Sequence, residues 1–166
     1  MFQVLVFFVT LVAVNVGSFK YASSSQLGTV EFPTSSSGPA QKHFIRGVAA
    51  LHSFWYTEAI SAFEQSTIAD PDFAMGYWGL AMAHNHPLWE DQDKKSAREA
   101  LSKITELSKL TQREQGYIHA IRLLYSDDEK RIRDKAYSKA MENVYRNYPD
   151  DLEAACFYSL SKLGVA

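Results

Sequence analysis

Apolar residues recur every three to four positions, with short interruptions, from Pro39 almost to the end of this 166-residue chain. The stretch from Ala97 to Leu107 is the clearest case. Its apolar residues fall at i, i+3, i+4, i+7 and i+10 and therefore share one face of an α-helix. No segment shows the apolar–polar alternation that is typical of a half-buried strand. The sequence therefore predicts an all-α fold of about seven helices.

Prolines and capping residues divide this periodic region into separate helices. Pro71, Pro87 and Pro149 each end a predicted helix, because proline lacks the N–H group that a helix interior needs. The stretch Thr111–Glu114 is a capping-box sequence and predicts the start of a helix. Asp150-Asp151 predicts another start near the carboxyl end. The predicted helices are short, consecutive and antiparallel.

The first residues differ from the rest. Phe2–Val16 is almost free of polar side chains but is too short to span a bilayer comfortably, and the small residues Gly17 and Ser18 follow it. The pattern predicts a signal peptide over residues 1–18 and a mature chain that begins near Phe19. An uncleaved signal anchor is the alternative. With cleavage we expect a secreted or lumenal (periplasmic) protein that is not held in a membrane.

Residues 19–38 are rich in Ser, Thr, Gly and Pro, with serine triplets at 23–25 and 35–37. Such a composition offers little apolar surface to offset the entropy lost on ordering. The sequence predicts a flexible linker here, followed by a helical domain over residues 39–166.

The first two predicted helices also show the marks of a two-helix repeat. Between Ala40 and Pro71, the small residues Gly47 and Ala59 fall where two helices would cross, and Phe63 would fill the space beside that contact. These positions are similar to those of one tetratricopeptide (TPR) unit. Further stretches resemble a broad family of larger, mostly uncharacterised TPR proteins, of which this chain looks like an amino-terminal portion. They are Ala74–Ala83, Thr111–Ile118, Ala136–Met141 and Tyr148–Asp151. The resemblance implies a right-handed solenoid of antiparallel helix-turn-helix pairs.

The same resemblance implies a concave groove lined by fixed positions of the first helix of each pair. By register these positions are Gln41, Phe44, Val48, Leu51, His52, Met75, Trp78, Met82, Asn85 and His86. A groove of this kind is apolar with imidazole edges, and it suits an amphipathic helix or an extended apolar peptide. We therefore expect a protein-protein interaction scaffold. The alternatives are the amino-terminal part of an enzyme or larger assembly whose active site lies elsewhere, or an inactive fragment.

Signals for other chemistry are weak. A net charge of −2 and a pI near 6.2 give no reason to expect nucleic acid as a partner. His84 and His86 are two residues apart, and no third ligand follows at a spacing typical of a metal site. We predict no metal, no cofactor and no enzymatic activity. Cys156 is the single cysteine, so no internal disulfide forms, and its place on a predicted helix favours a buried, inert thiol.

The last predicted helix, from Leu152 to Leu163, is apolar around much of its circumference. Each unit of a solenoid buries its apolar face against the next unit. We therefore expect the 166-residue chain to self-associate or to fray at this helix, and its native form to continue or to bind a partner here.

Overall fold

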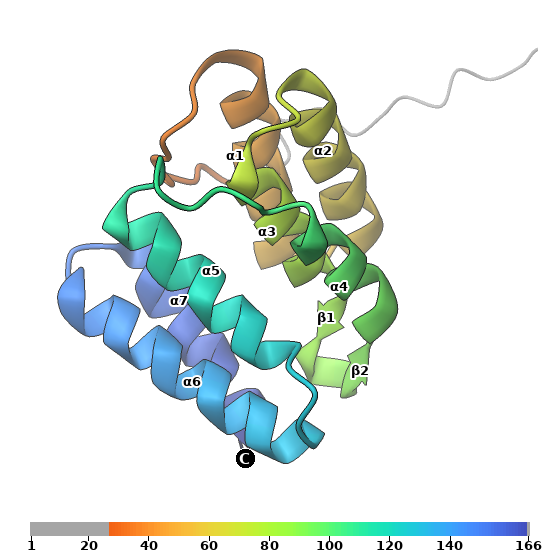
Figure 1. Cartoon of the computed structure of the whole chain (residues 1–166), viewed down its shortest axis with the longest axis vertical. Helices are drawn as coiled ribbons and strands as arrows, with labels where there is room; N and C mark the ends of the chain where they lie inside the picture. The colour runs from red at the N-terminus through yellow and green to blue at the C-terminus, as the bar shows by residue number, and fades with distance from the viewer. Residues whose placement is uncertain (1–26, 166) are drawn as a thin grey trace, which may run out of the picture.

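The computed structural model describes residues 27–165 (Figure 1). The predicted signal peptide, the predicted mature start at Phe19 and the first part of the predicted linker lie outside the described residues. Within the described part, none of the helices is both long enough and apolar enough to cross a membrane.

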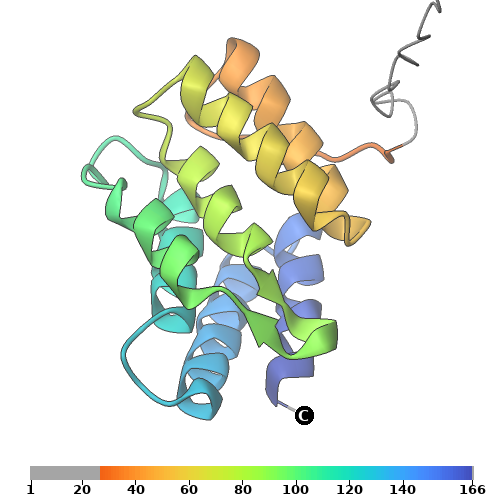
Figure 2. The ribbon, with the colours of Figure 1, turned by 90° about the vertical axis from the view of Figure 1, so that its right-hand side faces the viewer.

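Residues 27–165 form seven α-helices that pack one after another in chain order (Figure 1). They are α1 (Gly38–His52), α2 (Tyr56–Ala69), α3 (Ala74–Ala83), α4 (Lys94–Ser102), α5 (Gln112–Leu124), α6 (Lys130–Asn147) and α7 (Leu152–Ser161). Short 3-10 helices occupy Pro87–Trp89 and Leu163–Val165. Figure 2 shows α1 and α2 across one end of the molecule, α5, α6 and α7 at the other, and α3 between them. The predicted mostly helical class is confirmed.

One short strand pair departs from the all-helical prediction. β1 (Asn85–His86) and β2 (Asp91–Gln92) are antiparallel and join α3 to α4. Each strand has only two residues, which is too short for an alternating pattern to appear in the sequence.

The capping box at the start of α5 is present as predicted. The Thr111 side chain accepts the backbone N–H of Glu114, and the Glu114 carboxylate accepts the backbone N–H of Thr111. Asp151 caps α7 by accepting the backbone N–H groups of Glu153 and Ala154. These two caps fix where α5 and α7 begin, and both take part in the site described below.

The helix predicted up to Leu107 ends earlier, at Ser102. Ile104 nevertheless stays buried at 5% exposure, and its carbonyl oxygen accepts a hydrogen bond from Arg122 of α5. The apolar period continues past the helix end because it reports burial, and an irregular loop can bury the same side chains when a polar side chain satisfies its backbone.

The predicted contact between Gly47 and Phe63 is confirmed, and Gly79 of α3 joins it. A Cβ atom added at Gly47 would lie 2.5 Å from a ring carbon of Phe63, and one added at Gly79 would lie 2.3 Å from the ring. The fully buried Phe63 ring therefore sits between the backbones of α1 and α3.

The two aromatic residues of α7 pack against different helices, Phe157 against α3 and Tyr158 against α6. Phe157 is buried, with its ring 5.2 Å from that of Trp78, while the Tyr158 ring stacks on Tyr145 of α6 at 5.8 Å. Leu152 remains 77% exposed. Self-association through this helix stays a prediction. The Cys156 thiol was expected to be buried and is exposed, because the face of α7 that packs inward carries Phe157 instead.

Candidate functional site

The second half of the predicted linker, residues 27–37, packs against the helices; we call this segment the arm. Figure 1 shows it passing from α1 to the start of α5. Phe32 is 1% exposed and belongs to the hydrophobic core, and Leu27 and Val30 pack against that core. The expected flexible linker is therefore corrected for these residues. The serine-rich composition does not reveal this single aromatic anchor, whose burial offsets part of the entropy lost on ordering the segment.

The Phe32 ring is enclosed by side chains from three helices. Its ring centroid lies 5.1 Å from that of Phe44 on α1, 5.6 Å from Trp78 on α3 and 4.9 Å from Tyr117 on α5. The guanidinium carbon of Arg113 lies 4.2 Å from the Phe32 ring centroid, a cation–π distance. The arm thus places one side chain at the meeting point of α1, α3 and α5.

The groove predicted by register is not an open surface in this structure. Six of its positions are buried: Phe44, Val48, Leu51, Met75, Trp78 and Met82. Phe32 covers Phe44 and Trp78, and Phe157 of α7 covers Trp78 from another side. The remaining predicted residues are less buried: His52 is exposed, while Gln41, Asn85 and His86 are half-buried. The predicted positions do gather on facing helices, but the chain itself covers most of them.

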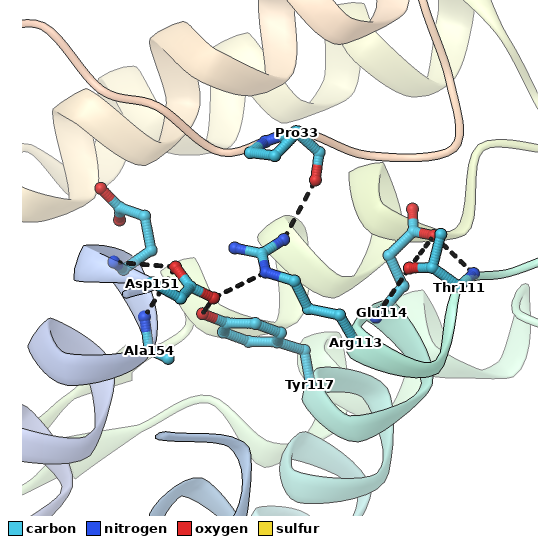
Figure 3. Close-up of polar contacts among 8 residues, drawn as sticks. Pro33, Thr111, Arg113, Glu114, Tyr117, Asp151 and Ala154 are labelled. Carbon is cyan, nitrogen blue, oxygen red and sulfur yellow. Dashed lines mark hydrogen bonds and ion pairs between the residues drawn. The ribbon is translucent and has the colours of Figure 1, made fainter. Parts of the chain in front are cut away.

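Arg113 connects the arm to the start of α7. Its Nε donates to Asp151 Oδ2 at 2.6 Å, and its Nη1 donates to the carbonyl oxygen of Pro33 at 3.0 Å (Figure 3). Asp151 Oδ2 also accepts the hydroxyl of Tyr117 at 3.1 Å. Burial alone would lower the pKa of Arg113, but the hydrogen bond to Asp151 and the nearby negative charge outweigh it and raise that pKa. Arg113 is therefore a fixed cation between two acceptors.

Glu114 is fully buried and binds the arm with the carboxylate oxygen that the capping box leaves over. Its Oε2 accepts the backbone N–H and the hydroxyl of Thr111, both at 2.8 Å (Figure 3). Its Oε1 accepts the backbone N–H of Ser35 at 2.8 Å and the Ser35 hydroxyl at 2.9 Å. Gln41 adds a hydrogen bond from Nε2 to the carbonyl oxygen of Phe32 at 2.7 Å. The backbone of the arm is thus held at three points, Phe32, Pro33 and Ser35, by side chains of α1 and α5.

The sequence singled out Glu114 only as a capping residue, and it did not single out Phe32, Arg113 or Asp151 as site residues. The capping box predicted that Glu114 bonds to Thr111, but not that it also bonds to Ser35, which lies 79 residues away in the chain. A lone phenylalanine followed by proline in a serine-rich segment was the one available signal for the arm.

The polar contacts of His86 are local, and its ring packs on Tyr56 of α2 at a centroid distance of 4.0 Å. His86 Nδ1 lies 2.9 Å from Asp91 Oδ2, and His86 Nε2 lies 3.1 Å from the carbonyl oxygen of Ala83. Burial is the main cause of a lowered pKa at His84. Among the residues that the structure describes, no three His, Cys, Asp or Glu side chains are grouped so as to hold a metal ion.

No family model, curated protein or solved structure matches this chain.

Proposed function

We propose that this protein is a TPR-like helical scaffold that binds an extended polypeptide segment where α1, α3 and α5 meet. The observation that carries the proposal is the arm, which already lies there as an extended peptide would. Phe32 fills a pocket between three helices, and Gln41, Arg113 and Glu114 hold successive backbone groups.

These contacts are of the two kinds that peptide-binding sites combine. Hydrogen bonds to backbone groups provide affinity for any extended segment, and a side-chain pocket provides selectivity. The pocket is lined by Phe44 and Trp78, which are also groove positions in the TPR register. The resemblance and the packing therefore favour the same face of the molecule.

In the free protein the arm occupies this site in cis. A short tether gives the arm an effective concentration in the range of about 1 mM, so a partner segment has to displace it. Gly38 joins the arm to α1 with a φ of 71°, a conformation that suits glycine, and a Cβ there would meet no atom within 4 Å. Gly38 is therefore the residue at which the backbone can change direction when the arm leaves.

The test uses the full chain with Phe32→Ala, which weakens the arm, and a fluorescein-labelled peptide of residues 28–38. Fluorescence anisotropy measures binding. We expect the variant to bind at least about tenfold more tightly than the parent, because the arm of the parent competes. The control is the same peptide with alanine in place of Phe32, which should not bind.

Circular dichroism establishes that the variant is helical, and Phe32→Leu serves as a milder second variant. If neither folded variant binds the peptide more tightly than the parent chain does, the proposed function is wrong.

A further inference from the structure

This inference rests on the proposed function and names the class of partner. We propose that the site selects segments with an aromatic residue, a proline directly after it, and an unmodified serine or threonine three residues after the aromatic residue. Glu114 is the residue that determines selectivity at the hydroxyl position.

The first position requires an aromatic ring. The Phe32 ring meets Phe44 edge-to-face at an interplanar angle of 88°, and the Arg113 guanidinium lies over the same ring. Both interactions depend on the quadrupole of an aromatic ring, and an aliphatic side chain of equal size would lose them.

The second position is occupied by Pro33. Proline fixes its own φ and biases the residue before it toward extended conformations. The contact at this position uses only the carbonyl oxygen of Pro33, which accepts from Arg113. Proline therefore fits here although it has no backbone N–H. A segment with proline here loses less conformational entropy on binding, which favours it over more flexible segments.

The hydroxyl position is defined by a buried carboxylate oxygen that only accepts hydrogen bonds. Both oxygens of Glu114 are engaged: Oε2 by Thr111, and Oε1 by the backbone N–H and hydroxyl of Ser35. Serine or threonine supplies the second donor, and alanine does not. An aspartate or a phosphoserine would bring a second negative charge against the buried carboxylate, where repulsion is strong.

The nearby cations do not cancel this repulsion. Arg113 forms an ion pair with Asp151, which balances its charge, and it also donates to Pro33; its Nη2 atom has no hydrogen-bond partner among the described residues. Lys103 and Lys109 line the hollow beside the serine triplet, but Asp70, Asp72 and Glu106 line it too. The net charge facing Ser35 remains negative, so the site discriminates against modified or acidic residues.

The experiment adds two labelled peptides to the parent 28–38 peptide, one with phosphoserine at position 35 and one with phosphoserine at position 37. Position 37 is the matched control, because Ser35 and Ser37 are both exposed but only Ser35 donates hydrogen bonds to Glu114. Binding to the Phe32→Ala chain is measured by anisotropy. We expect phosphoserine at 35 to weaken binding at least about tenfold, and phosphoserine at 37 to change it less than about threefold.

The second part of the experiment measures the same peptides against a chain that carries both Phe32→Ala and Glu114→Gln. Glutamine removes the negative charge and keeps one acceptor oxygen, so it can accept from Thr111 or from Ser35 but not from both. That loss is the same for both phosphopeptides, so the penalty at position 35 relative to position 37 should fall below about threefold. A purely structural role for Glu114 would leave the ratio between the two phosphopeptides unchanged.

The outcomes separate the two proposals. If the unphosphorylated 28–38 peptide binds neither Phe32 variant more tightly than it binds the parent chain, the proposed function fails. If it does bind, and phosphoserine has the same effect at both positions, only the selectivity inference fails. A penalty at position 35 that persists in the Glu114→Gln chain would overturn the role of Glu114.

Discussion

Gly79→Ala tests the packing of Phe63 between two helix backbones. The new methyl carbon would lie 2.3 Å from two carbons of the ring, whereas carbon atoms pack at about 3.5–4.0 Å. The ring would have to move by roughly 1 Å, and Gly47 blocks the opposite side, because a Cβ there would itself lie 2.5 Å from the ring. Overpacking of this kind costs about 1–3 kcal/mol, while the higher helix propensity of alanine returns about 1 kcal/mol. Because glycine positions on two helices hold the ring, we expect a cost of about 2–3 kcal/mol within this range and a net loss of about 1–2 kcal/mol in the free energy of unfolding.

The same substitution should become favourable when the ring is absent. Phe63→Ala alone should cost about 3–5 kcal/mol by leaving a cavity. Adding Gly79→Ala to that variant should then stabilise it by about 1 kcal/mol, because only the helix propensity remains. The double-mutant cycle therefore predicts a coupling of about 2–3 kcal/mol between the two positions.

Urea denaturation followed by circular dichroism measures all four chains. Gly116→Ala on α5 is the matched control, because its Cβ would meet one methyl group, Cγ2 of Val144, at 3.0 Å. We expect that control to change stability by less than about 1 kcal/mol. Equal costs of Gly79→Ala with and without the Phe63 ring would refute the reasoning.

Three further predictions concern α5, α7 and the single cysteine. Asp151→Ala should cost about 3–5 kcal/mol in urea denaturation, because it leaves Arg113, whose side chain is only 13% exposed, without its carboxylate partner; a loss below 1 kcal/mol would contradict this. Thr111→Ala should cost about 0.5–2 kcal/mol by removing a helix cap, and an unchanged urea midpoint would count against it. Although the Cys156 thiol is exposed, partial desolvation and then the charges of Glu153 and Asp151 raise its pKa. Iodoacetamide should therefore alkylate Cys156 more slowly at pH 8 than a cysteine in an unstructured peptide, and equal rates would exclude the raised pKa.

Local signals predicted the helices well. The capping box at Thr111 and Glu114 located the start of α5, because it depends on residues three apart in the chain. The contact between Gly47 and Phe63 followed from the need for a small residue where helices cross. The predicted end of α4 at Leu107 was wrong, because the helix ends at Ser102. The apolar period continues past that point since Ile104 is buried in the loop that follows.

The packing around the arm was predicted in part. The register placed Phe44 and Trp78 on one face, and both contact Phe32. That this pocket holds Phe32 depends on contacts between distant segments, which composition does not reveal; a serine-rich stretch predicts a linker whether or not one aromatic residue anchors it. The second partner of Glu114 was missed for the same reason, since Ser35 lies far from it in the chain.

The most direct test of the account is an NMR measurement of where the 28–38 peptide binds. Intermolecular NOEs between the unlabelled peptide and the isotopically labelled Phe32→Ala chain report which protons lie close together. We predict NOEs from the phenylalanine ring of the peptide to the rings of Trp78 and Tyr117, which surround Phe32 in the parent protein. NOEs confined to surface aromatic residues such as Phe54 and Trp89 would contradict the account.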